Sequence, residues 1–111
     1  MANTFKNAFA ANVNHAAYVD LYTAPSSTTT IVLGLTLCNK TASAVDVTVQ
    51  IQDTSDSNND FQVLDTVSIP ARTTLEVMAG QKYVLETTDV LRVKSGTASS
   101  LDATLGIMEI T

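Results

Sequence analysis

The sequence is poor in the residues from which most catalytic and metal sites are built. It has one cysteine, one histidine, no tryptophan and four glycines in 111 residues. A single cysteine excludes a disulfide within the chain, and one Cys with one His is too few for a zinc site. The glycines form neither dinucleotide-binding nor phosphate-loop patterns. A catalytic Ser–His or Cys–His pair would have to recruit His15 from the N-terminal stretch. We therefore predict no enzymatic activity and no cofactor.

Positive charge is also scarce. Six Lys and Arg stand against eleven Asp and Glu, for a formal net charge of −5. The basic residues are scattered, and only Arg92 and Lys94 lie close together. Binding to phosphates needs clustered cations, so we expect neither nucleic acid nor an anionic membrane as a partner. The sequence has no apolar run of the ~20 residues that a membrane span needs and no signal-peptide pattern. We expect synthesis in the cytoplasm.

What the chain has in abundance is threonine, with 17 residues, together with 9 serines. Threonine is β-branched and favours strands. From Ala17 onward apolar residues recur with a period of two, as in a sheet with one dry and one wet face. The clearest example is "AVDVTVQIQD", whose apolar positions are Val45, Val47, Val49 and Ile51. In "TIVLGLTLCN" the core face is predicted to hold Ile31, Leu33, Leu35 and Leu37, with Val32, Gly34, Thr36 and Cys38 opposite.

Two interruptions of this period predict β-bulges. One lies near Leu64 and Asp65, where Leu64 breaks the alternation. The other is expected near Gly106, because the apolar positions change parity there toward Met108 and Ile110.

About eight short strands with regularly spaced turns predict an all-β domain. An antiparallel two-sheet β-sandwich, jelly-roll or Ig-like, is favoured over a closed barrel. We predict a single sandwich domain over residues 17–111, preceded by a short N-terminal arm over residues 1–16.

The arm contains Phe5, Phe9 and Val13 at spacings of four, as on one helical face. Its asparagines disfavour a helix. The alternatives are an arm that orders against a neighbouring subunit and a frayed terminus. We predict these three side chains as protein-interface anchors.

A polar turn carries the acidic residues Asp53, Asp56 and Asp60. The EF-hand pattern fails, because Asn58 replaces its glycine and Leu64 its bidentate glutamate. A looser calcium loop remains a candidate beside a solvated turn, and no other metal site is expected.

The strands carry few charges, although exposed edges are normally guarded by charge, proline or bulges. This favours a subunit covered by other chains, and we expect a homo-oligomer.

Three ordered segments carry a family resemblance: "LYTAPSSTTTIVLGLTLCN", "SIPARTTLEVMAGQKYVLETTDVLRVKS" and "DATLGIMEIT". Together they resemble small virion structural proteins of tailed bacteriophages, including phages of cyanobacteria and other aquatic bacteria. The likeness covers about residues 17–111. Arg72 and Thr88 stand where that family commonly has glycine. The resemblance implies a location in the virion, as a capsid decoration (cement) protein or a neck, collar or tail accessory, bound to major capsid or neck and tail subunits. It implies no catalytic residue.

The leading interpretation is thus a multi-copy, non-enzymatic virion subunit. The alternative is a receptor- or glycan-binding domain of a tail fibre or spike, and an enzyme is a distant third.

Overall fold

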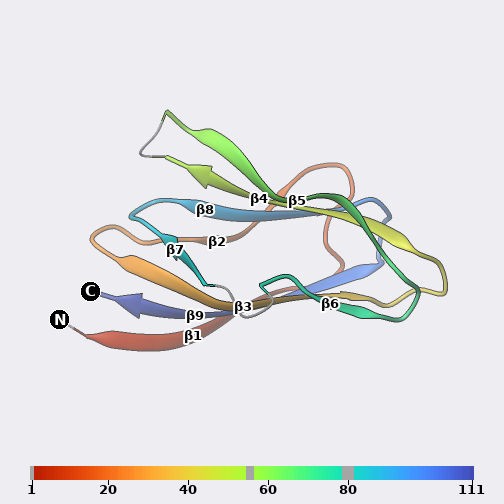
Figure 1. The fold of residues 1–111 in the computed structure, drawn as a ribbon, viewed down its shortest axis with the longest axis horizontal. Coiled ribbons are helices and arrows are strands. Elements are labelled where there is room, and N and C mark those ends of the chain that lie inside the picture. The colour runs from red at the N-terminus through yellow and green to blue at the C-terminus, as the bar shows by residue number, and fades with distance from the viewer. Residues whose placement is uncertain (1, 55–56, 79–81) are drawn as a thin grey trace.

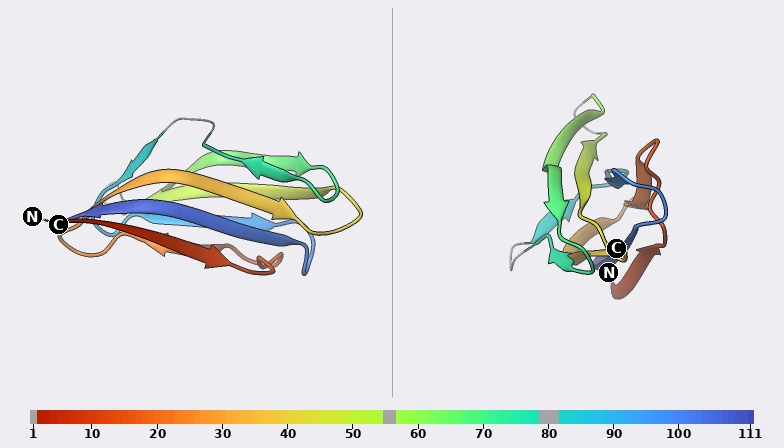
Figure 2. Two further views of the ribbon diagram at one scale, coloured as in Figure 1. Left: turned by 90° about the horizontal axis from the view of Figure 1, so that it is seen from below. Right: turned by 90° about the vertical axis from the view of Figure 1, so that its right-hand side faces the viewer.

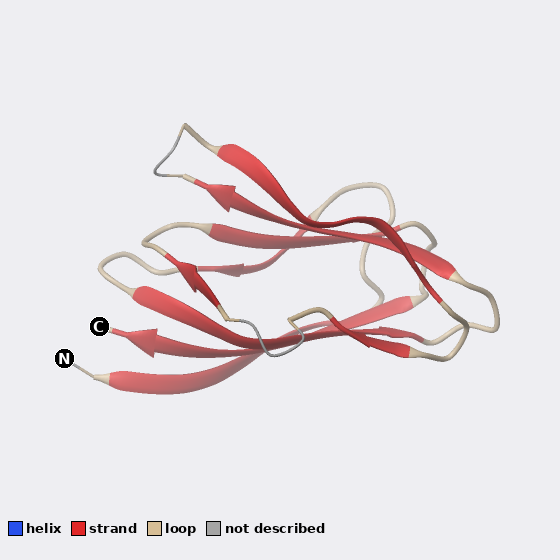
Figure 3. Cartoon of the chain, in the orientation of Figure 1, coloured by secondary structure: helices blue, strands red, loops and turns tan. Residues whose placement is uncertain are grey.

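The computed structural model describes residues 2–54, 57–78 and 82–111, and every regular element among them is a strand (Figure 3). The described residues contain no helix, and so none long and apolar enough to cross a membrane. The strands are β1 (Asn3–Ala10), β2 (Val19–Thr23), β3 (Thr29–Asn39), β4 (Val45–Asp53), β5 (Asn59–Ile69), β6 (Thr74–Glu76), β7 (Tyr83–Leu85), β8 (Val90–Ser95) and β9 (Leu101–Ile110).

The strands form two antiparallel sheets that pack face to face, which confirms the predicted β-sandwich (Figures 1 and 2). Sheet A has the order β1-β9-β3-β6, with β7 also paired to β3. Sheet B has the order β2-β8-β4-β5. The two termini lie together at one end of the molecule (Figure 1).

The core lies between the sheets and is built from branched aliphatic side chains. Val45, Val47 and Val49 of β4 point inward, as their alternation predicted. They face sheet A, where the most deeply buried side chains include Leu35, Leu37, Leu85, Leu101, Leu105 and Ile107. Burial of this apolar surface is the main favourable term for the fold.

The predicted core face of β3 is wrong at its first half. Leu35 is 1% exposed, but Leu33 is 40% exposed and Val32 is buried in its place. The register against β9 shifts between Val32 and Gly34. Because one extra residue reverses the side-chain parity beyond it, this bulge sends Leu33 to the outer face of sheet A.

The bulge predicted near Gly106 in β9 is also wrong, since β9 alternates without interruption to its end. Ile107 and Glu109 are buried, whereas Met108 and Ile110 are half-buried on the outer face. The irregularity belongs to the neighbouring strand β3, just before the pair formed by Gly34 and Gly106. The sequence suggested a change of parity because a buried glutamate was not expected.

The bulge predicted in β5 is confirmed. Val47 pairs with Val67 and Val49 with Leu64, so β5 has an extra residue between these pairs. Thr66 adopts φ 53° within this irregularity.

The N-terminal residues form a strand, so a helical face is the wrong description of them. β1 pairs antiparallel with β9 along its whole length, from Asn3 opposite Ile110 to Ala10 opposite Ala103. Phe5 and Phe9 are four apart, which also places them on one face of a strand. The ladder with β9 and the polar contacts described below decide in favour of the strand.

The bulge in β3 predicts a large difference between two neighbouring leucines. Leu35→Ala should reduce the free energy of unfolding by about 2–5 kcal/mol, because it leaves a cavity in the core. Leu33→Ala should reduce it by less than about 1 kcal/mol, because that side chain is partly solvated on the outer face. Urea denaturation of both variants measures the difference, and equal losses would contradict the bulge.

Candidate functional site

The outer face of sheet A carries most of the exposed large apolar side chains found among the described residues. These are Phe5, Phe9, Leu33 and Val84, while Phe61 lies on β5 of sheet B. Four outward-facing positions are direct neighbours across four strands: Phe5 opposite Met108, Met108 opposite Ile31, and Ile31 opposite Val84. We call this set the apolar row. It crosses β1, β9, β3 and β7.

A shallow hollow of about 190 Å³ lies beside the apolar row. Its lining consists of Phe5, Lys6, Asn7, Leu33, Gly106 and Ile107. The paired residues Gly34 and Gly106 leave this part of the face without side chains. A Cβ at Gly34 would meet no atom within 4 Å, and one at Gly106 only the Asn7 side-chain oxygen at 3.7 Å. Packing within the chain therefore does not require glycine at either position.

The predicted interface residues separate in the structure. Phe5 and Phe9 are 72% and 68% exposed on the outer face, whereas Val13 is 1% exposed in the chain's own core. Val13 is held there by a hydrogen bond from its backbone N–H to the Leu101 carbonyl, at 2.8 Å. Sequence reasoning missed Leu33 and Val84. The exposure of Leu33 depends on a bulge in β3 that has no signal in the sequence. The place of Val84 beside the other apolar residues depends on the pairing of β7 with β3.

A buried carboxylate ties β1 to the rest of the sandwich. Glu109 accepts a hydrogen bond from the Tyr22 hydroxyl at 2.6 Å and forms an ion pair with Lys6 at 2.9 Å. The Tyr22 hydroxyl also lies 2.8 Å from Thr30 Oγ1. Lys6 comes from β1, Glu109 from β9 and Tyr22 from sheet B, so this polar cluster joins the edge strand to both sheets.

The cluster shifts the pKa values of its members. The hydrogen bond from Tyr22, followed by that from Lys6, lowers the pKa of Glu109, because both stabilise the carboxylate. Burial and the hydrogen bond to Glu109 raise the pKa of Tyr22 to about 12. Glu109 therefore remains ionised and Tyr22 remains a hydrogen-bond donor at neutral pH.

A second polar cluster fixes the segment that follows β1. The Asn12 backbone N–H donates to Asp102 Oδ1 at 3.0 Å, and Lys40 pairs with the same oxygen at 3.0 Å. The bond from Asn12, ahead of the contacts with Lys40, lowers the pKa of Asp102.

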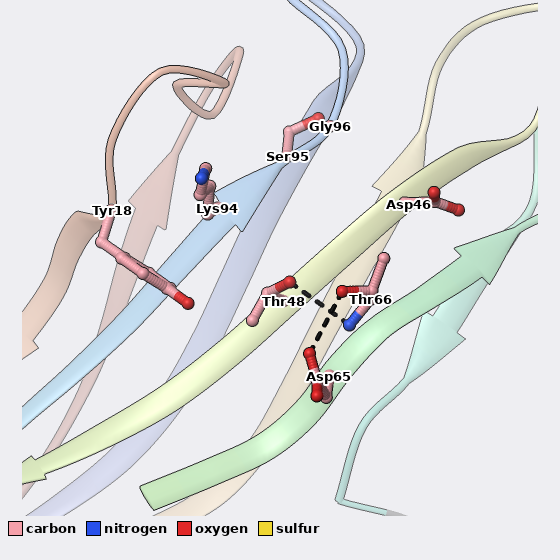
Figure 4. Close-up of a pocket in the computed structure, with 8 residues that line it drawn as sticks. All are labelled: Tyr18, Asp46, Thr48, Asp65, Thr66, Lys94, Ser95 and Gly96. Atoms are coloured by element: carbon pink, nitrogen blue, oxygen red, sulfur yellow. Dashed lines mark hydrogen bonds between the residues drawn. The ribbon is translucent and has the colours of Figure 1, made fainter. Parts of the chain in front are cut away.

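The outer face of sheet B bears an open polar pocket of about 310 Å³. Figure 4 shows the Tyr18 ring extending over β8 toward Thr48, with Asp46 and Asp65 on the far side. The Lys94 ammonium lies 5.7 Å from the centre of the Tyr18 ring. The Thr66 N–H donates to Thr48 Oγ1 at 3.3 Å and the Thr66 hydroxyl to Asp65 at 3.1 Å, so the bulge in β5 positions two of the lining residues.

The acidic loop gives no complete calcium site among the described residues. Asp53 ends β4, and Asp60 lies 3.9 Å from the Arg92 guanidinium. Asp56 lies outside the described residues. Within the described part of the chain, no three His, Cys, Asp or Glu residues group as metal ligands would.

The lowered pKa of Glu109 predicts a pH-dependent contribution to stability. A group whose pKa is lower in the folded state stabilises the fold above its unfolded pKa, about 4.3, and loses this as the pH falls through the folded value. Glu109→Gln should thus be less stable than the wild type at pH 7, by about 1–3 kcal/mol. The gap should close toward pH 3, as measured by urea denaturation. A gap that stays constant down to pH 3 would contradict the assignment.

Comparisons with known proteins establish the fold. The sequence matches no protein-family profile, and no curated protein matches it in sequence. In structure, the chain is similar to a protein of Bacillus endospore appendages, described as disulfide-linked pili, with a TM-score of 0.59 and 11% identity over 98% of this chain and 88% of that one. It is equally similar to a protein of the acidic stable capsid of Helicobacter pylori bacteriophage KHP30, with a TM-score of 0.58 and 11% identity over 100% and 94% of the two chains.

A third similar structure belongs to the infectious bursal disease virus particle, with a TM-score of 0.52 and 10% identity. The match covers 96% of this chain but 30% of that one, so it involves one part of a longer protein. At these identities the likeness concerns the fold. The chain thus has a β-sandwich that also occurs in proteins of pili and viral particles.

Proposed function

We propose that the protein is a non-enzymatic structural subunit of a bacteriophage virion, present in many copies. It docks onto neighbouring virion proteins through the outer face of sheet A, as a capsid decoration (cement) protein or a neck or collar accessory. Its partners are major capsid or neck and tail subunits, and it reaches the virion after synthesis in the host cytoplasm.

The observation that carries this proposal is the combination of the apolar row with the hollow beside it. The row presents Phe5, Met108, Ile31 and Val84 side by side, and Leu33 flanks the hollow. Contiguous exposed apolar surface marks protein interaction sites in soluble proteins. The hollow adds shape to this surface, since a partner's side chain can enter where Gly106 in its lining has no side chain.

The comparisons and the sequence resemblance support the same assignment. The three similar structures come from pili or viral particles, assemblies built from many subunits. The likeness to the phage capsid protein spans nearly the full length of both chains. The resemblance of the three sequence segments to tailed-phage virion proteins favours a virion over a pilus.

The charge distribution fits a protein partner better than a nucleic acid. Lys6, Lys40 and Arg92 are already engaged in ion pairs with Glu109, Asp102 and Asp20, respectively. With a net charge of −5, little positive potential remains for phosphates.

A second candidate function is glycan binding, favoured by the pocket on sheet B. Tyr18 offers a ring face, and Asp46, Asp65 and Thr48 offer hydrogen-bonding oxygens within one open depression. Small-ligand sites typically combine an apolar surface with a small number of precisely placed polar groups. This function suits a fibre or spike domain that binds a host receptor.

Gly34→Val is expected to block docking while leaving the fold intact. A Cβ at this position meets no atom within 4 Å, and valine favours a strand more than glycine does, so the urea midpoint should stay equal or rise. Gly34 pairs with Gly106, which lines the hollow, so the added side chain projects from the outer face next to the hollow that a partner would enter. Incorporation into particles, produced with the structural proteins of the virus that encodes the chain, should fall at least ~10-fold by quantitative mass spectrometry if about 1.4 kcal/mol of docking is lost.

Phe61→Ser is the matched control, because Phe61 is 52% exposed but lies on β5 of sheet B. Its incorporation should equal that of the wild type. Normal incorporation of Gly34→Val would refute docking through this face.

The glycan hypothesis predicts that the wild-type protein binds one class of saccharide on an array and that Tyr18→Ala loses this binding. Loss of ring stacking and of the pocket wall should weaken binding at least ~10-fold. Phe61→Ser again serves as the control, because Phe61 does not line the pocket. An array without hits would reject this candidate.

A further inference from the structure

The edge strands of the described sandwich differ in how well they resist pairing with another chain. β6 and β7 have three residues each. β2 has five residues and a register shift between Asp20 and Tyr22, and β5 contains two register shifts. β1 has eight residues, no register shift against β9 and no proline. Among the described edges, β1 is therefore the long, regular one, and such an edge is a template for strand addition.

The phase of the backbone hydrogen bonds identifies which residues of β1 face outward. Ala2 and Thr111 exchange both N–H···O bonds, at 3.3 and 3.0 Å. Antiparallel partners alternate between bonded and non-bonded pairs. Thr4, Lys6 and Ala8 thus bond to β9, whereas Asn3, Phe5, Asn7 and Phe9 direct their N–H and C=O groups away from the sheet.

We propose that the edge of β1 binds the β1 strand of a second copy of this chain. The two strands run antiparallel about a two-fold axis at Asn7, and the two A sheets become one continuous sheet. Phe5 of each copy then lies opposite Phe9 of the other, and the two Asn7 residues face one another. Aromatic cross-strand pairs of this kind stabilise sheets.

A second copy fits this edge because the sequence of β1 is self-complementary about Asn7. Centring the axis on Lys6 would set two lysines opposite each other and pair each phenylalanine with an asparagine. Centring it on Phe5 would shorten the ladder and leave Phe9 beyond the paired residues. With Asn7 on the axis, Lys6 lies opposite Ala8, and its charge already has Glu109 as a partner.

No other described strand pairs with the outer side of β1. β1 forms the outer border of sheet A, beyond β9 (Figures 1 and 2). Phe5 and Phe9 are 72% and 68% exposed, so pairing would cover apolar surface as well as backbone. The inference goes beyond the proposed function, because the free protein can dimerise whether or not it enters a virion.

The position of Asn7 on the axis allows a charge-exchange test. The wild type should be a dimer by sedimentation equilibrium. Asn7→Asp and Asn7→Lys each place two like charges opposite one another across the axis. Their repulsion should raise the dimer dissociation constant about tenfold or more. Mixing the two variants should restore a dimer containing one copy of each, because opposite charges then meet on the axis.

Thr104→Asp is the control, since it places a charge on the same face of β9, opposite Phe9 and away from the axis. It should dimerise as the wild type does. Circular dichroism checks that every variant remains folded; Asn7 is exposed, so either charge should be tolerated in a monomer.

A monomeric wild type at 100 micromolar or more, about the range of weak protein association, would overturn the proposal. So would a dimer that both Asn7 variants leave intact, because its interface would lie elsewhere. A monomer that nevertheless enters particles would reject the β1 dimer and retain the proposed virion function. A β1 dimer that never enters particles would retain the β1 pairing and reject the proposed virion function.

Discussion

The bulge at Leu33 in β3 is the constraint on which both faces of sheet A depend. β3 is the centre of that sheet and pairs with β9, β6 and β7. On one side of the bulge Val32 enters the core, and on the other side Leu35 and Leu37 do so. The same extra residue places Leu33 outside, next to a stretch floored by glycine. One insertion therefore completes the core while creating the apolar surface that we assign to docking.

The polar cluster around Glu109 solves a different problem, that of holding an edge strand with little hydrophobic burial. Most side chains of β1 are exposed, so burial alone contributes little to its attachment. The ladder to β9 and the Lys6–Glu109–Tyr22 contacts replace that burial. A buried carboxylate is costly unless it is paired and hydrogen-bonded, and here both oxygens have partners. The Lys6 side chain is 52% exposed at this edge, but its charge is paired with Glu109.

The sequence predicted those features that depend on local patterns. Strict alternation located β4, and the break of alternation at Leu64 located the bulge in β5. It failed where partners distant in the sequence decide the outcome. Around Leu33 both sets of alternate residues are largely apolar, so the sequence does not show which set faces the core. Glu109 can be buried because Tyr22 and Lys6, both distant in the sequence, contact its carboxylate. The spacing of Phe5 and Phe9 places them on one face of a helix or a strand alike, so their shared exposed face followed from the sequence although the helix did not.

Arg72 and Thr88 illustrate how a local backbone preference can be broken without changing the fold. Arg72 and Thr88 adopt φ 53° and φ 68°, a left-handed conformation in which glycine carries no steric penalty. In this chain, contacts offset the strain: the Thr88 N–H donates to the Ala24 carbonyl at 2.9 Å, and the Arg72 N–H to the Thr41 carbonyl at 3.1 Å. These bonds connect turns that are distant in the sequence, so the conformation is imposed by the sandwich as a whole.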